Sequence, residues 1–395
     1  MEKMKNKNNI IKGLIIIGLT IILIICLVIA FNDTKVDNIQ TNELALDSSN
    51  TESAIIDSNS DVSTNTDTST STNTTSNSDV VNTTSSTNSK NMNITAGGSY
   101  DLSGEYGSVT INTNKEVTLN LNGVEITNSN GPAINIKEAK TVTIVLSGTN
   151  KITSTTTEDL DGAIYSKADL VISGTGSLEV KSNYDGIVSK DTLVIKSGTY
   201  NITSSDDGIR GKDSVEILDG TFTINAGGDG IKASNDEDTN AGYVTISGGN
   251  YNITAKSDGI QGITKVTISG GTINITSAEG IEATYIKIDN GNINISATDD
   301  GINASQKSNI GTPTIEINGG NIKVNMGQGD TDAIDSNGNI YINGGTIDIT
   351  GNSPFDYDGT AKKNGGTIIV NGTETNTITN QMMGGGMMNG GRHGR

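Results

Sequence analysis

The chain has 395 residues, of which 45 are Asp or Glu and 26 are Lys or Arg, so its formal net charge is −19. This charge argues against nucleic acid as a partner, because phosphates would be repelled. A single cysteine excludes a disulfide within the chain, and the one histidine, His393, lies near the C-terminus, which argues against catalytic triads and histidine-ligated metals.

The first segment, residues 1–31, is predicted to be a signal anchor or a signal peptide. Four lysines precede an apolar run from Gly13 to Phe31, which is about long enough to cross a bilayer. Val28-Ile29-Ala30 fits a cleavage site, whereas the length of the run favours a retained anchor, so both alternatives stay open. In either case the positive residues remain inside, and everything after Phe31 is exported. The membrane is therefore an expected partner of this segment.

Residues 32–92 are dominated by Ser, Thr, Asn and Asp, with few apolar residues. Such a composition cannot bury enough apolar surface to offset the entropy lost on ordering, so this segment is predicted to be a disordered linker. A membrane segment, a long polar spacer and the lack of disulfides suggest an extracellular protein on the surface of a Gram-positive type bacterium.

A repeated signature, an acidic residue followed by Gly-Ile, organises the rest of the chain. It occurs at Asp185, Asp207, Asp229, Asp258, Glu279 and Asp300, with variants at Asp161 and Asp332. Successive spacings from Asp161 are 24, 22, 22, 29, 21, 21 and 32 residues. A period near 22 that is made of short strands and Gly turns is typical of a β-solenoid.

One repeat contains three short alternating strands, as in Val266–Ile268, Ile273–Ile275 and Ile281–Ala283. Their apolar residues face one way, and a single coil cannot bury them. The sequence therefore predicts an all-β fold, a right-handed parallel β-helix of about ten coils over residues 93–376. The longer spacings place loops at Ser234–Gly242 and Ser305–Pro313, and residues 377–395 are predicted to be a flexible Gly/Met-rich tail.

If the coils stack in register, the acidic residues form a column with ~5 Å between neighbours, where each pair repels by about 1 kcal/mol in water. Arg210 and Lys232, each three residues after an acidic residue, are one source of neutralising charge. The other is Ca²⁺, which prefers several carboxylate and carbonyl oxygens. A third interpretation is that each acidic residue only turns a corner, since Asp-Gly is a common turn pair.

Three groups of acidic residues are candidate metal sites. The first is Asp185, Asp206 and Asp207; the second is Glu279, Asp299 and Asp300; the third is Asp330, Asp332 and Asp335. The second group favours a metal, because the outward residues beside it, Glu282 and Asn303, are not basic.

Aromatic residues bear on sugar binding, because sugar rings usually stack on aromatic faces and this chain has no Trp. The candidate substrate-binding residues are the outward Tyr243, Tyr285 and Tyr341, together with Arg210. Three other aromatic residues share one repeat position and are expected to stack inside the core: Tyr200, Phe222 and Tyr251. Outward asparagines of successive coils are expected to bond one another or to bind hydroxyls: Asn201, Asn252, Asn274 and Asn294.

The units S-x-D-D-G-I and V-T-I-S-G-G-x-x-N-I-T resemble those of the bacterial carbohydrate-binding domain family of calcium-containing right-handed β-helices, whose fold is similar to that of pectate lyases. The resemblance covers about residues 93–375. It implies binding of plant-type or other cell-wall or extracellular polysaccharide, with Ca²⁺ at Asp185, Asp206 and Asp207 and at Glu279, Asp299 and Asp300. Glu279 departs from the Asp of the repeat.

Two other functions remain open besides a non-catalytic polysaccharide binder. The first is a Ca²⁺-dependent polysaccharide lyase, for which Lys232 is the candidate base. The carboxylate of Asp229 would raise the pKa of this lysine, which is the wrong direction for a base. The second is an adhesin or a structural rod at the cell surface.

Overall fold

The computed structural model describes residues 90–156, 162–327 and 331–380, which lie within one compact unit, Thr83–Arg395. These residues form strands, turns and bends, and no helix is found among them. In particular, the described part of the chain has no helix of the length and apolarity needed to cross a bilayer. Several predicted features lie outside the described residues: the membrane segment, residues 32–89 of the linker, Asp161, Asp330, and residues 381–395 of the tail.

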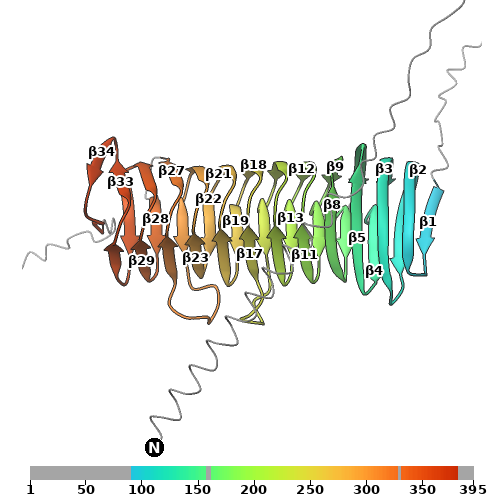
Figure 1. Cartoon of the computed structure of the whole chain (residues 1–395), viewed down its shortest axis with the longest axis horizontal. Coiled ribbons are helices and arrows are strands. Elements are labelled where there is room, and N and C mark those ends of the chain that lie inside the picture. The colour runs from blue at the N-terminus through green and yellow to red at the C-terminus, as the bar shows by residue number, and fades with distance from the viewer. Residues whose placement is uncertain (1–89, 157–161, 328–330, 381–395) are drawn as a thin grey trace, which may run out of the picture. The chain divides into compact units, whose positions relative to one another are not determined.

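The strands form three parallel columns, and each coil contributes one strand to each column (Figure 1). The first column, which follows the acidic corners, contains β1 (Lys90–Ile94), the second half of β2 (Gly98–Asn112), β4 (Ile134–Glu138), β7 (Ile164–Ser166), β10 (Ile187–Ser189), β13 (Ile209–Gly211), β16 (Ile231–Ala233), β19 (Asp258–Gly262), β22 (Glu279–Ala283), β25 (Ile302–Ala304), β28 (Asp332–Ser336) and β31 (Ser353–Tyr357).

The second column contains the first half of β2, the first half of β3 (Glu116–Asn128), β5 (Thr141–Ser147), β8 (Asp169–Gly174), β11 (Thr192–Ile195), β14 (Ser214–Ile217), β17 (Tyr243–Ile246), β20 (Lys265–Ile268), β23 (Tyr285–Ile288), β26 (Thr314–Ile317), β29 (Asn339–Ile342) and β32 (Ala361–Lys363).

The third column contains the second half of β3, β6 (Thr149–Ser154), β9 (Ser177–Ser182), β12 (Thr199–Ser204), β15 (Thr221–Ala226), β18 (Asn250–Ala255), β21 (Thr272–Ser277), β24 (Asn292–Ala297), β27 (Asn321–Met326), β30 (Thr346–Thr350) and β33 (Thr367–Val370). At its end β34 (Thr373–Thr375) pairs antiparallel with β33. The fold is thus a parallel β-helix, as predicted, and its first strand begins at Lys90.

The register places equivalent residues of successive coils on one another. Ile253 pairs with Ile275 and Ile275 with Ile295, and all three side chains are buried. The same holds in the first column, where Ile260 pairs with Ile281. The alternation of the sequence therefore becomes continuous rows of isoleucine inside the stack, and polar residues are left on the outside.

The predicted aromatic stack is confirmed. Tyr200 and Phe222 have ring centroids 4.8 Å apart with an interplanar angle of 4°, and Phe222 and Tyr251 have 4.8 Å and 3°. The two hydroxyls leave the core at its edge, because they donate to the carbonyls of Ser197 and Gly248 at 2.7 Å. These three residues are structural.

The glycine of the repeated signature is required by close packing between coils. At Gly230, an added Cβ would lie 2.4 Å from Ile253 Cγ2 and 2.6 Å from the carbonyl oxygen of Gly259 in the next coil. Gly186, Gly208, Gly259, Gly280 and Gly301 meet the same obstacle, with backbone carbonyl oxygens 2.3 to 2.7 Å away.

We therefore expect Gly230→Ala to destabilise the fold by about 3 kcal/mol, because a neighbouring backbone must move. Gly327→Ala is the matched control, since its added Cβ finds its nearest atoms at 3.6 and 3.7 Å. Urea unfolding followed by circular dichroism measures both. Equal midpoints for the two variants would contradict this packing argument.

Both predicted loops connect the first column to the second. Residues 234–242 join β16 to β17, and residues 305–313 join β25 to β26. They protrude at the same edge of the stack (Figure 1). Two coils without an insertion, those of β20 and β23, lie between them, so the loops border a short stretch of the second column.

Candidate functional site

The acidic residues of the signature form a ladder along the first column, here called the acidic ladder: Asp185, Asp207, Asp229, Asp258, Glu279, Asp300 and Asp332. Asp207 N–H donates to Asp185 Oδ1 at 3.0 Å, and Asp229 N–H donates to Asp207 Oδ1 at 2.9 Å. Asp258 and Asp332 repeat this bond to Asp229 and Asp300. These carboxylates therefore tie each coil to the next, which the sequence interpretation did not anticipate.

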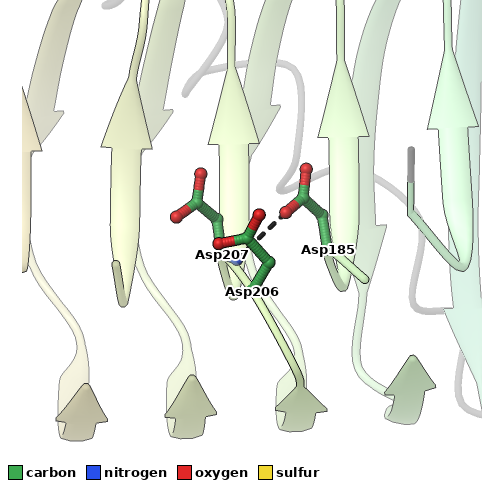
Figure 2. A group of neighbouring side chains, drawn as sticks. All are labelled: Asp185, Asp206 and Asp207. Carbon is green, nitrogen blue, oxygen red and sulfur yellow. Dashed lines mark hydrogen bonds between the residues drawn. The ribbon is translucent and has the colours of Figure 1, made fainter. Parts of the chain in front are cut away.

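The N-terminal part of the acidic ladder contains the first predicted metal group. One carboxylate oxygen from each of Asp185, Asp206 and Asp207 lies within 4.8 Å of the others, and Figure 2 shows the three side chains at one corner of the stack. Asp185 and Asp207 are buried, whereas Asp206 is exposed. The structure thus brings this predicted group together.

Two basic residues form ion pairs with the carboxylates of this part of the ladder. Arg210 donates through Nε to Asp185 Oδ2 at 2.8 Å and through Nη2 to the same oxygen. Lys232 Nζ lies 2.6 Å from Asp229 Oδ2 and 3.6 Å from Asp207 Oδ2. Burial raises the pKa of Asp207 to about 6, and Lys232 limits that rise. Arg210, a candidate sugar-binding residue, is thus engaged by a buried carboxylate.

A second cluster lies two coils further along the ladder. Asp258, Glu279 and Glu282 place one carboxylate oxygen each within 4.8 Å of one another. Asp258 and Glu282 are buried and Glu279 is half-buried. Burial and the Asp229 carboxylate raise the pKa of Asp258 to about 8, and burial and Glu282 raise the pKa of Glu279 to about 7.

Few cations lie close to this second cluster. Gln261 donates to Asp258 Oδ2 and, at 3.1 Å, to Glu282 Oε2. Among the described residues one cation pairs with the cluster: Lys307 Nζ of the 305–313 loop lies 2.5 Å from Glu282 Oε2. The cluster therefore holds three carboxylates, and Lys307 pairs with one of them, Glu282.

The membership of this cluster differs from the predicted second group. Glu279 is present, but the ligand atoms near it belong to Asp258 and Glu282. Asp299 is exposed, and Asp300 accepts the Asp332 N–H at 3.1 Å instead. Glu282 follows Glu279 by three residues, just as Arg210 follows Asp207 and Lys232 follows Asp229. This spacing is the sequence signal that could have identified Glu282 as a member of the cluster.

Asn303 adds a neutral oxygen beside the cluster. Its Nδ2 donates to Glu279 Oε2 at 3.1 Å. Its side chain is 8% exposed, and its Oδ1 is buried with no hydrogen-bond partner among the described residues. A buried amide oxygen without a hydrogen bond costs folding free energy. A hydrogen-bond donor or a cation beside Asn303 Oδ1 would remove this cost.

The third predicted group is only partly described, because Asp330 lies outside the described residues. Asp332 accepts a hydrogen bond from Ser353 Oγ. Burial raises the pKa of Asp335 to about 7, with a further contribution from Asp300. In the C-terminal part of the acidic ladder, none of these outward residues is basic: Glu282 pairs in register with Asn303, and Asn303 pairs with Asp335.

The candidate tyrosines lie on the outer face of the second column. Tyr243 pairs with Lys265 and Lys265 with Tyr285, so the three occupy successive coils, beginning with the coil that carries the 234–242 loop. Tyr243 OH donates to Glu216 Oε1 at 2.9 Å, and Tyr285 OH donates to Glu316. Lys265 Nζ lies 5.5 Å from the centre of the Tyr285 ring.

Tyr341 occupies another row of the second column, paired with Glu316. Three of the four outward asparagines of the third column bond one another as expected: Asn274 donates to Asn252 at 3.1 Å, and Asn294 donates to Asn274 at 3.0 Å. Asn201 does not join them, because its in-register neighbours are Glu179 and Thr223.

Comparison with known proteins places this architecture in a family. The family model described as carbohydrate-binding domain-containing protein matches residues 88–333. A solved structure, the gadolinium derivative of a polysaccharide lyase-like protein from C. thermocellum, is similar to this chain at 32% identity, covering 52% of this chain and 87% of that chain with a TM-score of 0.46. A search of curated proteins found no match. The chain belongs to the family of carbohydrate-binding domain-containing proteins.

Proposed function

We propose that the chain is a non-catalytic, calcium-dependent polysaccharide-binding β-helix. Family membership supports carbohydrate as the ligand. The observation that supports the calcium requirement is the cluster of Asp258, Glu279 and Glu282, where the one described ion pair is that of Glu282 with Lys307.

The residues of the second cluster fit a hard divalent cation. Their donors are all oxygens, as Ca²⁺ prefers, and the unsatisfied Asn303 Oδ1 offers a neutral fourth oxygen nearby. When bound, Ca²⁺ would supply the charge that the buried carboxylates lack. The Asp185 group fits less well, because Arg210 already occupies one of its carboxylates.

The stretch of the second column between the two loops is the proposed sugar platform. Insertions on one face of a solenoid commonly border its binding face. Tyr243 and Tyr285 are held against the sheet by hydrogen bonds to Glu216 and Glu316, so their rings are pre-oriented for stacking. Rigid aromatic rings contribute contact area at a small entropic cost. The 305–313 loop also carries Lys307, which links this platform to the second cluster.

A lyase is disfavoured by the environment of its candidate base. Burial lowers the pKa of Lys232, but the carboxylates of Asp207 and Asp229 outweigh it and raise the pKa above its ordinary value. Lys232 therefore stays protonated near neutral pH and neutralises its neighbours. We expect no unsaturated sugar ends from polygalacturonate incubated with the protein and Ca²⁺, as measured by absorbance of the unsaturated product. Appearance of such ends, and their loss in Lys232→Ala, would make the chain a lyase.

We also propose a location at the surface of a Gram-positive type cell. The support is the sequence of residues 1–92, where an apolar segment precedes a polar spacer. This arrangement would present the β-helix to extracellular polysaccharide.

Retention of the full chain on insoluble polysaccharides, neutral and acidic, tests the binding function. We expect retention in Ca²⁺ to fall at least about tenfold in EDTA, and Glu282→Gln to lose its response to Ca²⁺ because a ligand oxygen loses its charge. Asp289→Asn is the matched control, since Asp289 lies on the outer face and pairs with Lys287 at 2.8 Å. If no polysaccharide retains the protein in Ca²⁺, the binding function is wrong.

A further inference from the structure

A groove that takes no part in the site above lies over the N-terminal coils. It has a volume of about 390 Å³ and is lined by, among others, Asn128, Asn130, Asn135, Lys137, Tyr165 and Lys167. None of its described lining residues is acidic, although the whole chain has 45 acidic and 26 basic residues. The described lining of the groove thus differs in charge from the chain as a whole.

A row of lysines begins in this groove with Lys137 and Lys167 and continues beyond it. Lys137, Lys167, Lys190 and Lys212 follow equivalent residues of β4, β7, β10 and β13. In-register backbone bonds fix them on successive coils: Lys167 N–H donates to Ile136 O at 2.9 Å, and Lys190 N–H donates to Ser166 O at 2.7 Å. The coils are ~4.8 Å apart, so each neighbouring pair of ammonium groups repels by about 1 kcal/mol in water if the side chains run parallel.

Acidic side chains lie beside part of this row, and Lys212 Nζ pairs with Glu237 Oε2 at 3.3 Å. Asp169 Oδ1 and Asp191 Oδ1 accept the Thr192 N–H at 3.3 and 3.1 Å, at the corner that leads to the second column. Lys137 and Lys167 are exposed, and neither forms an ion pair within the described part of the chain. Lys137 and Lys167 therefore present positive charge to the groove.

Tyr165 supplies an aromatic ring to the same groove. It pairs in register with Asn135 in the preceding coil and Val188 in the next, and Lys190 Nζ lies 5.9 Å from its ring centre. A ring, three amides and two ammonium groups in one groove suit a hydroxyl-rich ring that carries a negative charge.

We propose that this groove binds an acidic sugar residue of a polysaccharide, with the sugar carboxylate at Lys137 and Lys167 and the sugar ring against Tyr165. The inference rests on the proposed polysaccharide-binding function and adds a subsite that needs no Ca²⁺.

Isothermal titration of the full chain in EDTA tests this subsite, because EDTA removes any contribution of calcium. The probes are polygalacturonate and its fully methyl-esterified form, which has the same backbone without charge. We expect binding of polygalacturonate, weak binding of the ester, and a loss of affinity of about tenfold in the Lys137→Ala/Lys167→Ala variant, which removes two contacts. Lys196→Ala/Lys256→Ala, at two exposed lysines elsewhere, is the matched control.

Three outcomes would overturn the proposal: no binding of polygalacturonate in EDTA, equal binding of the ester, or the same affinity in the two double variants. Self-association through this row would also overturn it. It would appear as a larger sedimentation coefficient that the Lys137→Ala/Lys167→Ala variant reduces. Failure here with calcium-dependent retention intact would remove only the subsite, whereas failure of retention on every polysaccharide would remove the proposed function.

Discussion

Without divalent cations, the folded protein should lose stability as the pH rises from about 4 to 8. Burial and neighbouring carboxylates raise the pKa of Asp258 to about 8 and the pKa values of Glu279 and Asp335 to about 7, whereas these groups ionise near 4 in the unfolded chain. Between these values the folded state holds more protons than the unfolded state, so its advantage is complete below about pH 4 and is lost as the pH rises through the folded pKa values.

The size of this loss follows from the shifts. Each pKa unit corresponds to about 1.4 kcal/mol, so the loss amounts to several kcal/mol, with a smaller share from Glu279 and Asp335, which solvent partly screens. Ca²⁺ should reverse the loss at pH 8 and have little effect at pH 5, because protons then occupy the carboxylates. Scanning calorimetry at pH 5 and pH 8, in EDTA and in Ca²⁺, measures the four transition temperatures.

Substitutions locate the effect. Asp258→Asn should raise the stability of the metal-free protein at pH 8 and flatten its pH dependence, since it removes a buried charge. Asp289→Asn should leave the curve unchanged, because the Lys287 ammonium already lowers the pKa of Asp289. A metal-free protein that is as stable at pH 8 as at pH 5 would show that the acidic ladder is neutralised by other means.

Removal of Arg210 should be the most damaging change of a single side chain at the ladder. Arg210→Ala leaves Asp185, which is 3% exposed, without its cation, whereas Asp207 keeps Lys232 at 3.6 Å. Breaking a buried pair by removing one partner costs about 3 to 5 kcal/mol. Denaturant unfolding of Arg210→Ala at pH 7 measures this loss.

A second substitution separates charge from packing. Asp185→Asn added to Arg210→Ala should recover part of the stability, because the remaining buried group is then neutral. Lys140→Ala, which breaks the exposed pair with Glu116, should leave the midpoint unchanged. If Arg210→Ala unfolds at the midpoint of the unsubstituted protein, the pair with Asp185 has no structural role and Arg210 returns as a candidate sugar ligand.

The repeat was predictable because the acidic-Gly-Ile signature and the alternation of isoleucine recur in register. The same logic placed the stack of Tyr200, Phe222 and Tyr251, since equivalent positions of a solenoid must meet. The loops followed from the longer spacings between signatures.

The candidate site was only partly predictable, because side-chain length and direction decide which carboxylates meet. Glu279 is longer than the aspartates of the repeat, and its neighbours are Asp258 from the preceding coil and Glu282 on the same strand, rather than Asp299 and Asp300. The backbone bonds of the ladder depend on distances between coils that spacing alone does not give. The N-terminal groove was missed because its coils depart from the regular signature.

The antiparallel direction of β34 affects the exposed edge at the C-terminal end of the stack. The last coil of any parallel stack offers unpaired N–H and C=O groups, on which another copy of the chain could grow. In the third column β34 covers β33 in the antiparallel sense, so an incoming parallel strand meets the wrong polarity. In the third column β34 thus occupies the place that a further parallel strand would need for pairing with β33.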